Sequence, residues 1–318
     1  MRPGISTQPG PAALRRPLAA APARLVRIVA SSAAAAIATI AVALVIPGYG
    51  RAPGASELNA LGLTELRPGR FLYHLSGDFS RDGRPVTAPT VTAEIARGLV
   101  VMRHQVTEAA YRRCVDAMAC PMIDGRAAAV DRPAIRLSWR DASAYAAWLS
   151  ERSGMNLRLP TDEEWAYAAA SRFGGDAVPE SAIAADPGRR ELASYEADAR
   201  RDDAADREPR PIGSFGTNEN GLMDIAGNVW EWTDSCFTRN TVDRSGAAVV
   251  TGVNCGVRIA EGRHRAYVTD FIRDPRSGGC TVGTPPSNLG FRLVADIGAT
   301  QGLRAWLDQA RRFLHPAT

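Results

Sequence analysis

The sequence contains no lysine, only four histidines and no cysteine pair of the form C-x-x-C. Without such a pair, neither a zinc ribbon nor a thioredoxin-type redox site is indicated. The histidines are isolated and show no H-x-x-x-H spacing, which argues against a histidine-rich iron site; they are His74, His104, His264 and His315. Apart from these, every basic side chain is an arginine.

The basic charge gathers at the N-terminus. Residues 1–56 contain arginine but no acidic residue, whereas residues 57–318 contain all 34 Asp and Glu and slightly fewer arginines. The body of the chain is therefore close to neutral and shows no basic stripe that could neutralise phosphates. We do not expect a nucleic-acid partner.

An uncharged apolar run from Ile28 to Gly48 follows Arg24 and Arg27 and is about long enough to span a bilayer. The positive-inside rule places the N-terminus in the cytoplasm and the body outside. We expect residues 1–50 to form a cytoplasmic tail with a membrane anchor, followed by a linker at 51–65. A cleaved signal segment is the alternative. The predicted location is the inner membrane with a periplasmic domain, or the periplasm if the segment is cleaved.

Five cysteines fit an oxidising compartment. Cys114 and Cys120 lie on either side of a short loop, and Cys236 and Cys255 flank a longer polar loop. We interpret these as two disulfides, with Cys280 left as a single thiol. The alternative is that all five are reduced.

Local patterns predict several elements. Alternation around Tyr73 indicates a strand, and Gly98 to Met102 reads as a second. Thr107, Ser138 and Thr161 are each placed to cap a helix. Residues 176–210 read as a surface excursion, residues 213–296 as irregular chain with short strands, and residues 301–315 as an amphipathic helix.

Five sequence blocks follow one another along the chain. They are Val106 to Tyr111 (V-T-E-A-A-Y), Pro133 to Trp148 (P-A-I-R-L-S-W-R-D-A-S-A-Y-A-A-W), Arg158 to Trp165 (R-L-P-T-D-E-E-W), Asn220 to Trp232 (N-G-L-M-D-I-A-G-N-V-W-E-W) and Asn288 to Arg292 (N-L-G-F-R). In this order they resemble the motifs of the formylglycine-generating enzyme, or sulfatase-modifying factor, family. The resemblance implies an α+β fold over residues 66–296, a variant of the C-type-lectin fold rich in irregular structure. A C-terminal amphipathic helix at 297–318 would follow it.

The catalytic thiols of that family have no counterpart here. Its active members carry R-G-G-S-x-x-C-x-x-x-x-C before the closing G-F-R, and the two thiolates bind copper and convert a substrate cysteine to formylglycine. Aligned without gaps, Tyr267 and Ile272 occupy the two thiol positions, and Cys280 lies beyond them. We therefore expect neither copper nor formylglycine generation.

A structural calcium site is implied by the same resemblance. Its ligands would be the side chain of Asp224, the carbonyls of Gly227 and Val229, and the carboxylate of Glu231, a set of hard oxygen ligands that suits Ca²⁺. The alternative is that Glu231 simply pairs with an arginine.

The segment Arg263, His264 and Arg265, together with Tyr267, lies where the resemblance places the active groove. Two guanidinium groups and an imidazole suit anionic or carbonyl-rich ligands. We interpret them as a recognition groove, either exposed or paired with Glu261 or Asp270. A merely structural ion-pair network is the alternative.

Two classes of function follow. The first is an exported, membrane-anchored accessory or maturation protein that recognises a protein or peptide. The second is an oxidoreductase of the formylglycine-generating or non-haem-metal superfamily with a divergent site, for which Cys280 and His264 are the candidate catalytic residues. The stretch from Asn254 to Pro286 also resembles NirV-like accessory proteins found beside copper nitrite reductases in denitrifying bacteria. That likeness implies nitrite reductase as the partner.

Overall fold

The computed structural model describes residues 61–122, 130–175, 209–274, 281–282 and 288–296. The predicted membrane segment, most of the predicted linker and surface excursion, Cys280 and the predicted C-terminal helix lie outside these ranges. All described residues belong to one compact unit, residues 50–318. None of the helices in the described ranges is long and apolar enough to cross a membrane.

A four-stranded antiparallel sheet forms one part of the unit, with strand order β1-β6-β13-β7. Its strands are β1 (Leu63–Leu66), β6 (Leu99–Met102), β13 (Val294–Ala295) and β7 (Leu157–Arg158). All four residues of β6 are buried, as its unbroken apolar sequence predicts. β1 begins inside the segment that was expected to be a linker.

A second sheet consists of β2 (Gly69–His74) and β5 (Thr90–Ile95), paired antiparallel along their whole length. The strand predicted around Tyr73 is thus confirmed, and Tyr73 is its buried side chain. Leu72, on the opposite face, is 73% exposed.

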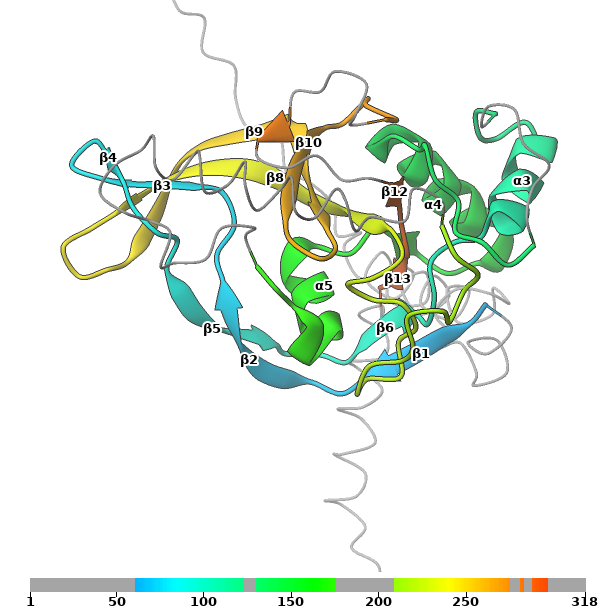
Figure 1. Cartoon of the computed structure of the whole chain (residues 1–318), viewed down its shortest axis with the longest axis horizontal. Coiled ribbons are helices and arrows are strands. Elements are labelled where there is room, and N and C mark those ends of the chain that lie inside the picture. Colours follow the sequence, from blue (N-terminus) through cyan, green and yellow to red (C-terminus); the bar gives the residue numbers. More distant parts are fainter. Residues whose placement is uncertain (1–60, 123–129, 176–208, 275–280, 283–287, 297–318) are drawn as a thin grey trace, which may run out of the picture. The chain divides into compact units, whose positions relative to one another are not determined.

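The largest sheet has the order β11-β10-β9-β8-β3-β4, with β12 paired to β8. Its strands are β3 (Asp78–Arg81), β4 (Arg84–Pro85), β8 (Trp230–Val242), β9 (Ala248–Glu261), β10 (Ala266–Thr269), β11 (Thr281–Val282) and β12 (Leu289–Gly290). β8 and β9 form a long antiparallel hairpin whose far end is accompanied by β3 and β4 (Figure 1).

The length of this hairpin differs from the sequence prediction of short strands only. β8 has 13 residues and β9 has 14. The reason is that the outer half of β9 is exposed, so its side chains are not required to alternate between apolar and polar. The irregular chain expected after residue 213 is found before β8, where Asp224, Ala226 and Asn228 adopt positive φ angles.

The three predicted helix starts are confirmed. α3 (Glu108–Asp116) is capped by Thr107, whose hydroxyl accepts a hydrogen bond from the Ala110 amide. α4 (Trp139–Ser153) and α5 (Asp162–Ala169) begin with the capping boxes of Ser138 and Thr161. A short 3-10 turn, η1 (Ala170–Arg172), follows α5. The architecture is therefore mixed α and β, as expected, with α5 in contact with strands β2, β5, β8 and β9.

Both predicted disulfides are formed. Cys114 is joined to Cys120 at the end of α3, and Cys236 is joined to Cys255 across the β8–β9 hairpin. Every cysteine in the part of the chain that the structure describes is therefore in a disulfide.

Candidate functional site

The two positions aligned with the catalytic thiols are structural contacts. Tyr267 lies in β10, its hydroxyl accepts a hydrogen bond of 2.8 Å from the Gly77 amide, and its ring meets Phe237 edge-on at 5.2 Å. Ile272 is half-buried and packs against the main hydrophobic core. Neither a phenol nor an alkyl chain offers the soft thiolate that Cu(I) prefers.

Arg263, His264 and Arg265 do not present their side chains to one common surface. Arg263 is exposed, whereas His264 and Arg265 are only 4% and 3% exposed. His264 Nδ1 lies 2.9 Å from the carbonyl oxygen of Arg265, and its ring is edge-on to Trp230 at 5.2 Å. Trp230 Nε1 in turn donates to the His264 carbonyl at 3.0 Å. Burial of His264 leaves Arg263 as the exposed member of the predicted groove.

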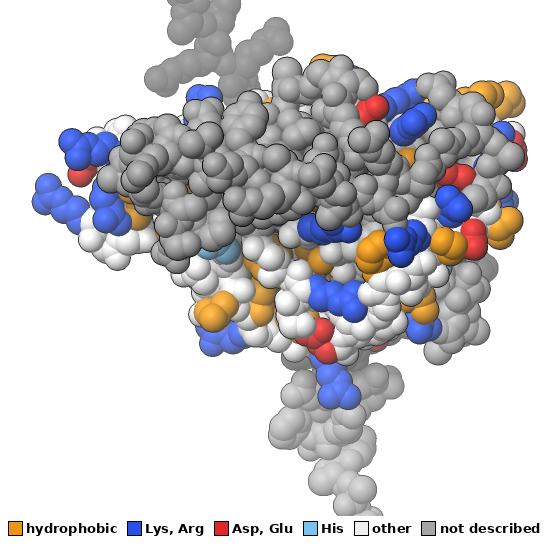
Figure 2. All heavy atoms as spheres, in the orientation of Figure 1, with side chains coloured by type: hydrophobic (Ala, Val, Ile, Leu, Met, Phe, Trp, Pro, Cys, Tyr) orange, Lys and Arg blue, Asp and Glu red, His pale blue; other side chains and the backbone are white. Residues whose placement is uncertain are grey.

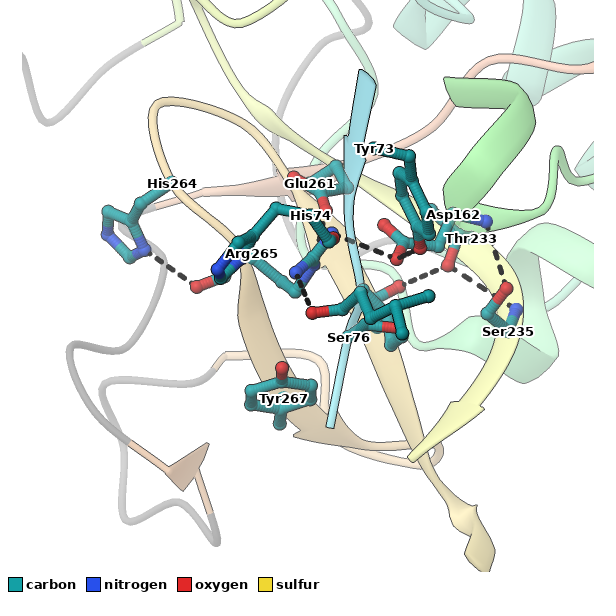
Figure 3. Close-up of polar contacts among 12 residues, drawn as sticks. Tyr73, His74, Ser76, Asp162, Thr233, Ser235, Glu261, His264, Arg265 and Tyr267 are labelled. Carbon is teal, nitrogen blue, oxygen red and sulfur yellow. Dashed lines mark hydrogen bonds and ion pairs between the residues drawn. The ribbon is translucent and has the colours of Figure 1, made fainter. Parts of the chain in front are cut away.

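Arg265 is the centre of a buried polar cluster (Figure 3). Its guanidinium group binds Glu261 at 2.8 Å and Asp162 at 3.1 Å, and it donates to the carbonyls of His74 and Leu75 at 3.0 and 3.2 Å. The side chains of Arg265, Asp162 and Glu261 are at most 2% exposed. The expected pairing of this segment with Glu261 is confirmed.

Asp270, the other expected partner, lies elsewhere. It binds Arg140 at the start of α4 at 3.0 Å. Of the two partners expected for the Arg263–Arg265 segment, Glu261 is the one that binds Arg265, whereas the turn after β10 directs Asp270 toward α4.

Asp162 reaches the cluster because the Thr161 capping box fixes the first turn of α5. Its backbone amide donates to Ser235 Oγ of β8 at 2.9 Å, and its carboxylate accepts a hydrogen bond from the Tyr73 hydroxyl of β2. The cluster thus ties together α5, β2, the end of β9 and the turn before β10.

One positive charge faces two carboxyl groups in this cluster, and their pKa values move apart. Burial and the charge of Asp162 raise the pKa of Glu261 well above its ordinary value, against the opposing effect of Arg265. Burial alone would raise the pKa of Asp162 as well, but the charge of Arg265 and hydrogen bonds from Glu261 and Tyr73 lower it. We therefore assign the ionised state to Asp162 and the protonated state to Glu261. The pKa of Tyr73 is raised by burial and by Asp162.

Of the four groups expected to bind calcium, three are engaged by donors of the protein. The Asp224 carboxylate accepts hydrogen bonds from the amides of Gly213 and Phe215 at 2.5 and 2.7 Å. The Gly227 carbonyl accepts from the Val229 amide at 2.7 Å.

Glu231 is fully buried and pairs with an arginine, as the alternative interpretation had it. Arg292 donates to both of its oxygens, at 2.5 and 2.7 Å. Trp165 Nε1 and Gln105 Nε2 each add a bond of 2.8 Å. Both oxygens of the Glu231 carboxylate therefore face hydrogen-bond donors. A calcium ion needs oxygen ligands that point at it from a distance of roughly 2.3–2.6 Å, so this arrangement does not fit one.

Four residues of these two clusters were not among the sequence candidates: Tyr73, Gln105, Asp162 and Arg292. The sequence carried a signal for three of them, because Gln105 directly precedes the Val106-Thr107 block, Asp162 opens a helix after a capping box, and Arg292 ends the closing G-F-R block. Nothing in the local sequence around Tyr73 points to a charged partner.

The chain is similar to a known protein family and to several named relatives. Residues 56–297 match the family described as "Sulfatase-modifying factor enzyme 1-like domain". The cattle protein (Bos taurus) "Inactive C-alpha-formylglycine-generating enzyme 2" is 33% identical over 176 residues, which cover 54% of this chain and 52% of that one. The "Formylglycine-generating enzyme" of Mycobacterium tuberculosis is 37% identical over 183 residues, covering 52% of this chain and 57% of that one.

The chain thus spans about half the length of the cattle and mouse inactive enzymes that it matches, 52% and 51% respectively. Among solved structures, PvdO from Pseudomonas aeruginosa is 19% identical with a TM-score of 0.45, covering 74% of this chain and 94% of that chain. Because the family match extends over most of the chain, the protein belongs to the sulfatase-modifying factor enzyme 1-like family.

Proposed function

We propose that this protein is a non-catalytic member of its family, an exported accessory or maturation protein that recognises a protein or peptide partner. The observation that carries the proposal is the structural use of the two former thiol positions, since Tyr267 and Ile272 are packed into the fold. Similarity to relatives that are named inactive supports it.

A buried network in place of a reactive site also favours recognition over catalysis. Arg265 is enclosed by Asp162, Glu261 and two main-chain carbonyls, so its guanidinium group stabilises the packing of the strands against the helix. Recognition then falls to exposed side chains near this cluster, of which Arg263 is one. On the face shown in Figure 2, the coloured arginines are scattered among hydrophobic and uncharged side chains.

Metal content distinguishes this proposal from an oxidoreductase with a divergent site. Full-length protein purified from the periplasm of an expressing host should contain no stoichiometric copper or iron by plasma mass spectrometry. An oxidoreductase of the copper or non-haem-iron type should carry about one such ion. Stoichiometric redox metal that is lost on Cys280→Ala or His264→Ala would replace the proposal with the enzymatic alternative.

The partner is proposed to be copper nitrite reductase, on the strength of the sequence likeness in the segment from Asn254 to Pro286. Deletion of the gene in a denitrifying host should lower the nitrite-reducing activity or copper content of the reductase, and the full-length gene should restore it. Unchanged reductase in the deletion strain would remove nitrite reductase as the partner.

Export and anchoring are tested by a fusion of alkaline phosphatase to the C-terminus. We expect an active fusion in the membrane fraction, because Ile28 to Gly48 precedes the domain after an arginine-rich flank. An active fusion in the soluble periplasmic fraction would indicate a cleaved segment, and an inactive fusion would contradict export.

A further inference from the structure

Main-chain carbonyls from the loop before β8 converge on one side chain. Gln105, between β6 and α3, directs its Nε2 atom at the carbonyl oxygens of Asp224 and Gly227, at 3.3 and 3.2 Å, and at Glu231 Oε1, at 2.8 Å. Gln105 is fully buried. Two of these three acceptors, the Gly227 carbonyl and the Glu231 carboxylate, are expected calcium ligands. The third is the main-chain carbonyl of Asp224, whose side chain was the expected ligand.

Arg292 supplies the positive charge that neutralises Glu231 beside Gln105. Its side chain is fully buried, it binds both oxygens of Glu231, and its remaining donors reach the carbonyls of Met102 and Met223, each at 3.1 Å. Trp165 Nε1 completes the surroundings of Glu231 Oε2. A charge buried with a matched partner and satisfied donors is tolerated, whereas a lone buried charge is strongly destabilising.

We propose that Gln105 and Arg292 together replace a calcium ion in this loop, so that the domain folds and keeps its shape without metal. The amide nitrogen stands where the carbonyls of Asp224 and Gly227 and the carboxylate of Glu231 converge, and the guanidinium group provides the neutralising charge. The inference is independent of the proposed function, since it concerns how the loop is held in either a binding protein or an enzyme.

Charge and distance both support this assignment. The three oxygens lie at hydrogen-bond distance from a nitrogen donor, not at the roughly 2.3–2.6 Å of a calcium ligand. A divalent cation placed beside Glu231 would also be close to the buried guanidinium group of Arg292, and repulsion between like charges is strong where water is excluded.

The orientation of the Gln105 amide makes the inference testable. Its Oε1 atom has no hydrogen-bond partner among the described residues. If the amide were turned around, that oxygen would face three other oxygens, which is favourable only with a cation between them. Gln105 Nε2 at this place and a bound calcium ion therefore exclude each other.

The experiment compares the thermal unfolding of full-length protein in excess chelator and in excess calcium. Wild-type protein should have the same melting temperature in both, because a ligand raises stability only if it binds the folded state. Terbium is a calcium mimic whose luminescence can be excited through a nearby tryptophan, and Trp165 lies beside the loop. Wild-type protein with terbium should give no more of this luminescence than the Glu231→Gln variant.

Gln105→Glu is the matched variant, since it keeps the shape and places a second carboxylate next to Glu231, and the added negative charge offsets the repulsion between Arg292 and a cation. It should melt at a lower temperature in chelator, recover in calcium and give terbium luminescence, whereas the exposed control Glu151→Gln should behave as wild type. A calcium-independent Gln105→Glu protein would overturn the inference that the amide occupies a cation's place.

The wild-type measurement decides by itself if Gln105→Glu does not fold. A melting temperature that falls in chelator, with terbium luminescence that Glu231→Gln removes, would show that the native loop binds calcium and would overturn the inference.

Discussion

Arg265 and Arg263 are neighbours in sequence with opposite surroundings, and this contrast gives a stability prediction. Arg265→Met would leave the ionised Asp162 buried without its positive partner, so we expect the free energy of unfolding to fall by about 3–5 kcal/mol. Arg263→Met, at an exposed position, should change it by no more than about 0.5 kcal/mol. Chemical denaturation of both variants measures the difference, and equal effects would contradict the buried ion-pair assignment.

Glu261 makes stability depend on pH in a defined direction. Its pKa in the folded protein is raised above 4.5, so the folded state holds this proton more tightly than the unfolded state. The resulting contribution to the free energy of unfolding is full below about pH 4.5 and is lost as pH rises through the folded pKa, by at most about 1.4 kcal/mol per pH unit. Asp162, whose pKa is lowered from 3.8, acts in the opposite sense at lower pH.

Glu261→Gln should therefore flatten the stability profile between about pH 5 and about pH 8, because a neutral amide replaces the titrating group. Denaturant unfolding of variant and wild type across this range is the measurement. The free energy of unfolding of the variant should rise relative to that of the wild type as the pH increases. Two profiles that run parallel would show that Glu261 does not carry the extra proton.

Residues with local partners could be predicted from the sequence, and those with distant partners could not. Thr161 and Glu164 cap α5 from within one turn, so their roles were readable. Arg265 was expected in an exposed groove or paired with Glu261 or Asp270. Its burial depends also on Asp162 and on carbonyls of β2 and the loop after it, which are far away in the sequence.

At the scale of elements, the β8–β9 hairpin carries the disulfide that closes the longer of the two disulfide loops, with a sequence separation of 19 against 6. Cys236 and Cys255 join its two strands, and Cys255 is exposed while Cys236 is half-buried. The stability change on removing this disulfide should therefore reflect the loss of the cross-link, with little contribution from lost side-chain packing. Cys236→Ala together with Cys255→Ala should lower the free energy of unfolding by about 2–4 kcal/mol.

Denaturant unfolding of that double variant, against wild type without reductant, provides the value. The exposed Val253→Ala on β9 is a matched control for altering the outer hairpin, and we expect its effect to be small. A double variant as stable as Val253→Ala would mean that the hairpin is held by its strand pairing alone.

The elements differ in how well sequence patterns predicted them. Helix starts were marked by Thr107, Ser138 and Thr161, whose side chains act on the adjacent amides. The length of β8 and β9 was missed because pairing between two partly exposed strands needs no regular apolar alternation. β1 was missed because Leu63–Leu66 is short and becomes a strand only by pairing with β6.

For the whole molecule, the blocks from Val106 to Arg292 specified the family, and the structure shows which contacts the residues at the implied metal positions make. The two former thiol positions are occupied by Tyr267 and Ile272, and the described cysteines are used in disulfides. The expected calcium ligands are engaged with Gln105, Arg292 and main-chain amides. The residues at which the resemblance implies copper or calcium are thus engaged in contacts within the chain.

The central proposal is that the protein lacks formylglycine-generating activity, and one assay tests it most directly. Purified full-length protein is loaded with copper, given a sulfatase-type cysteine peptide under air, and the products are examined by mass spectrometry for the aldehyde. We expect no aldehyde above the level of a heat-denatured sample, because copper oxidation needs two thiolates at close range and these positions offer a phenol and an alkyl chain. Catalytic turnover would contradict the account, and its loss in Cys280→Ala would place that cysteine in the mechanism.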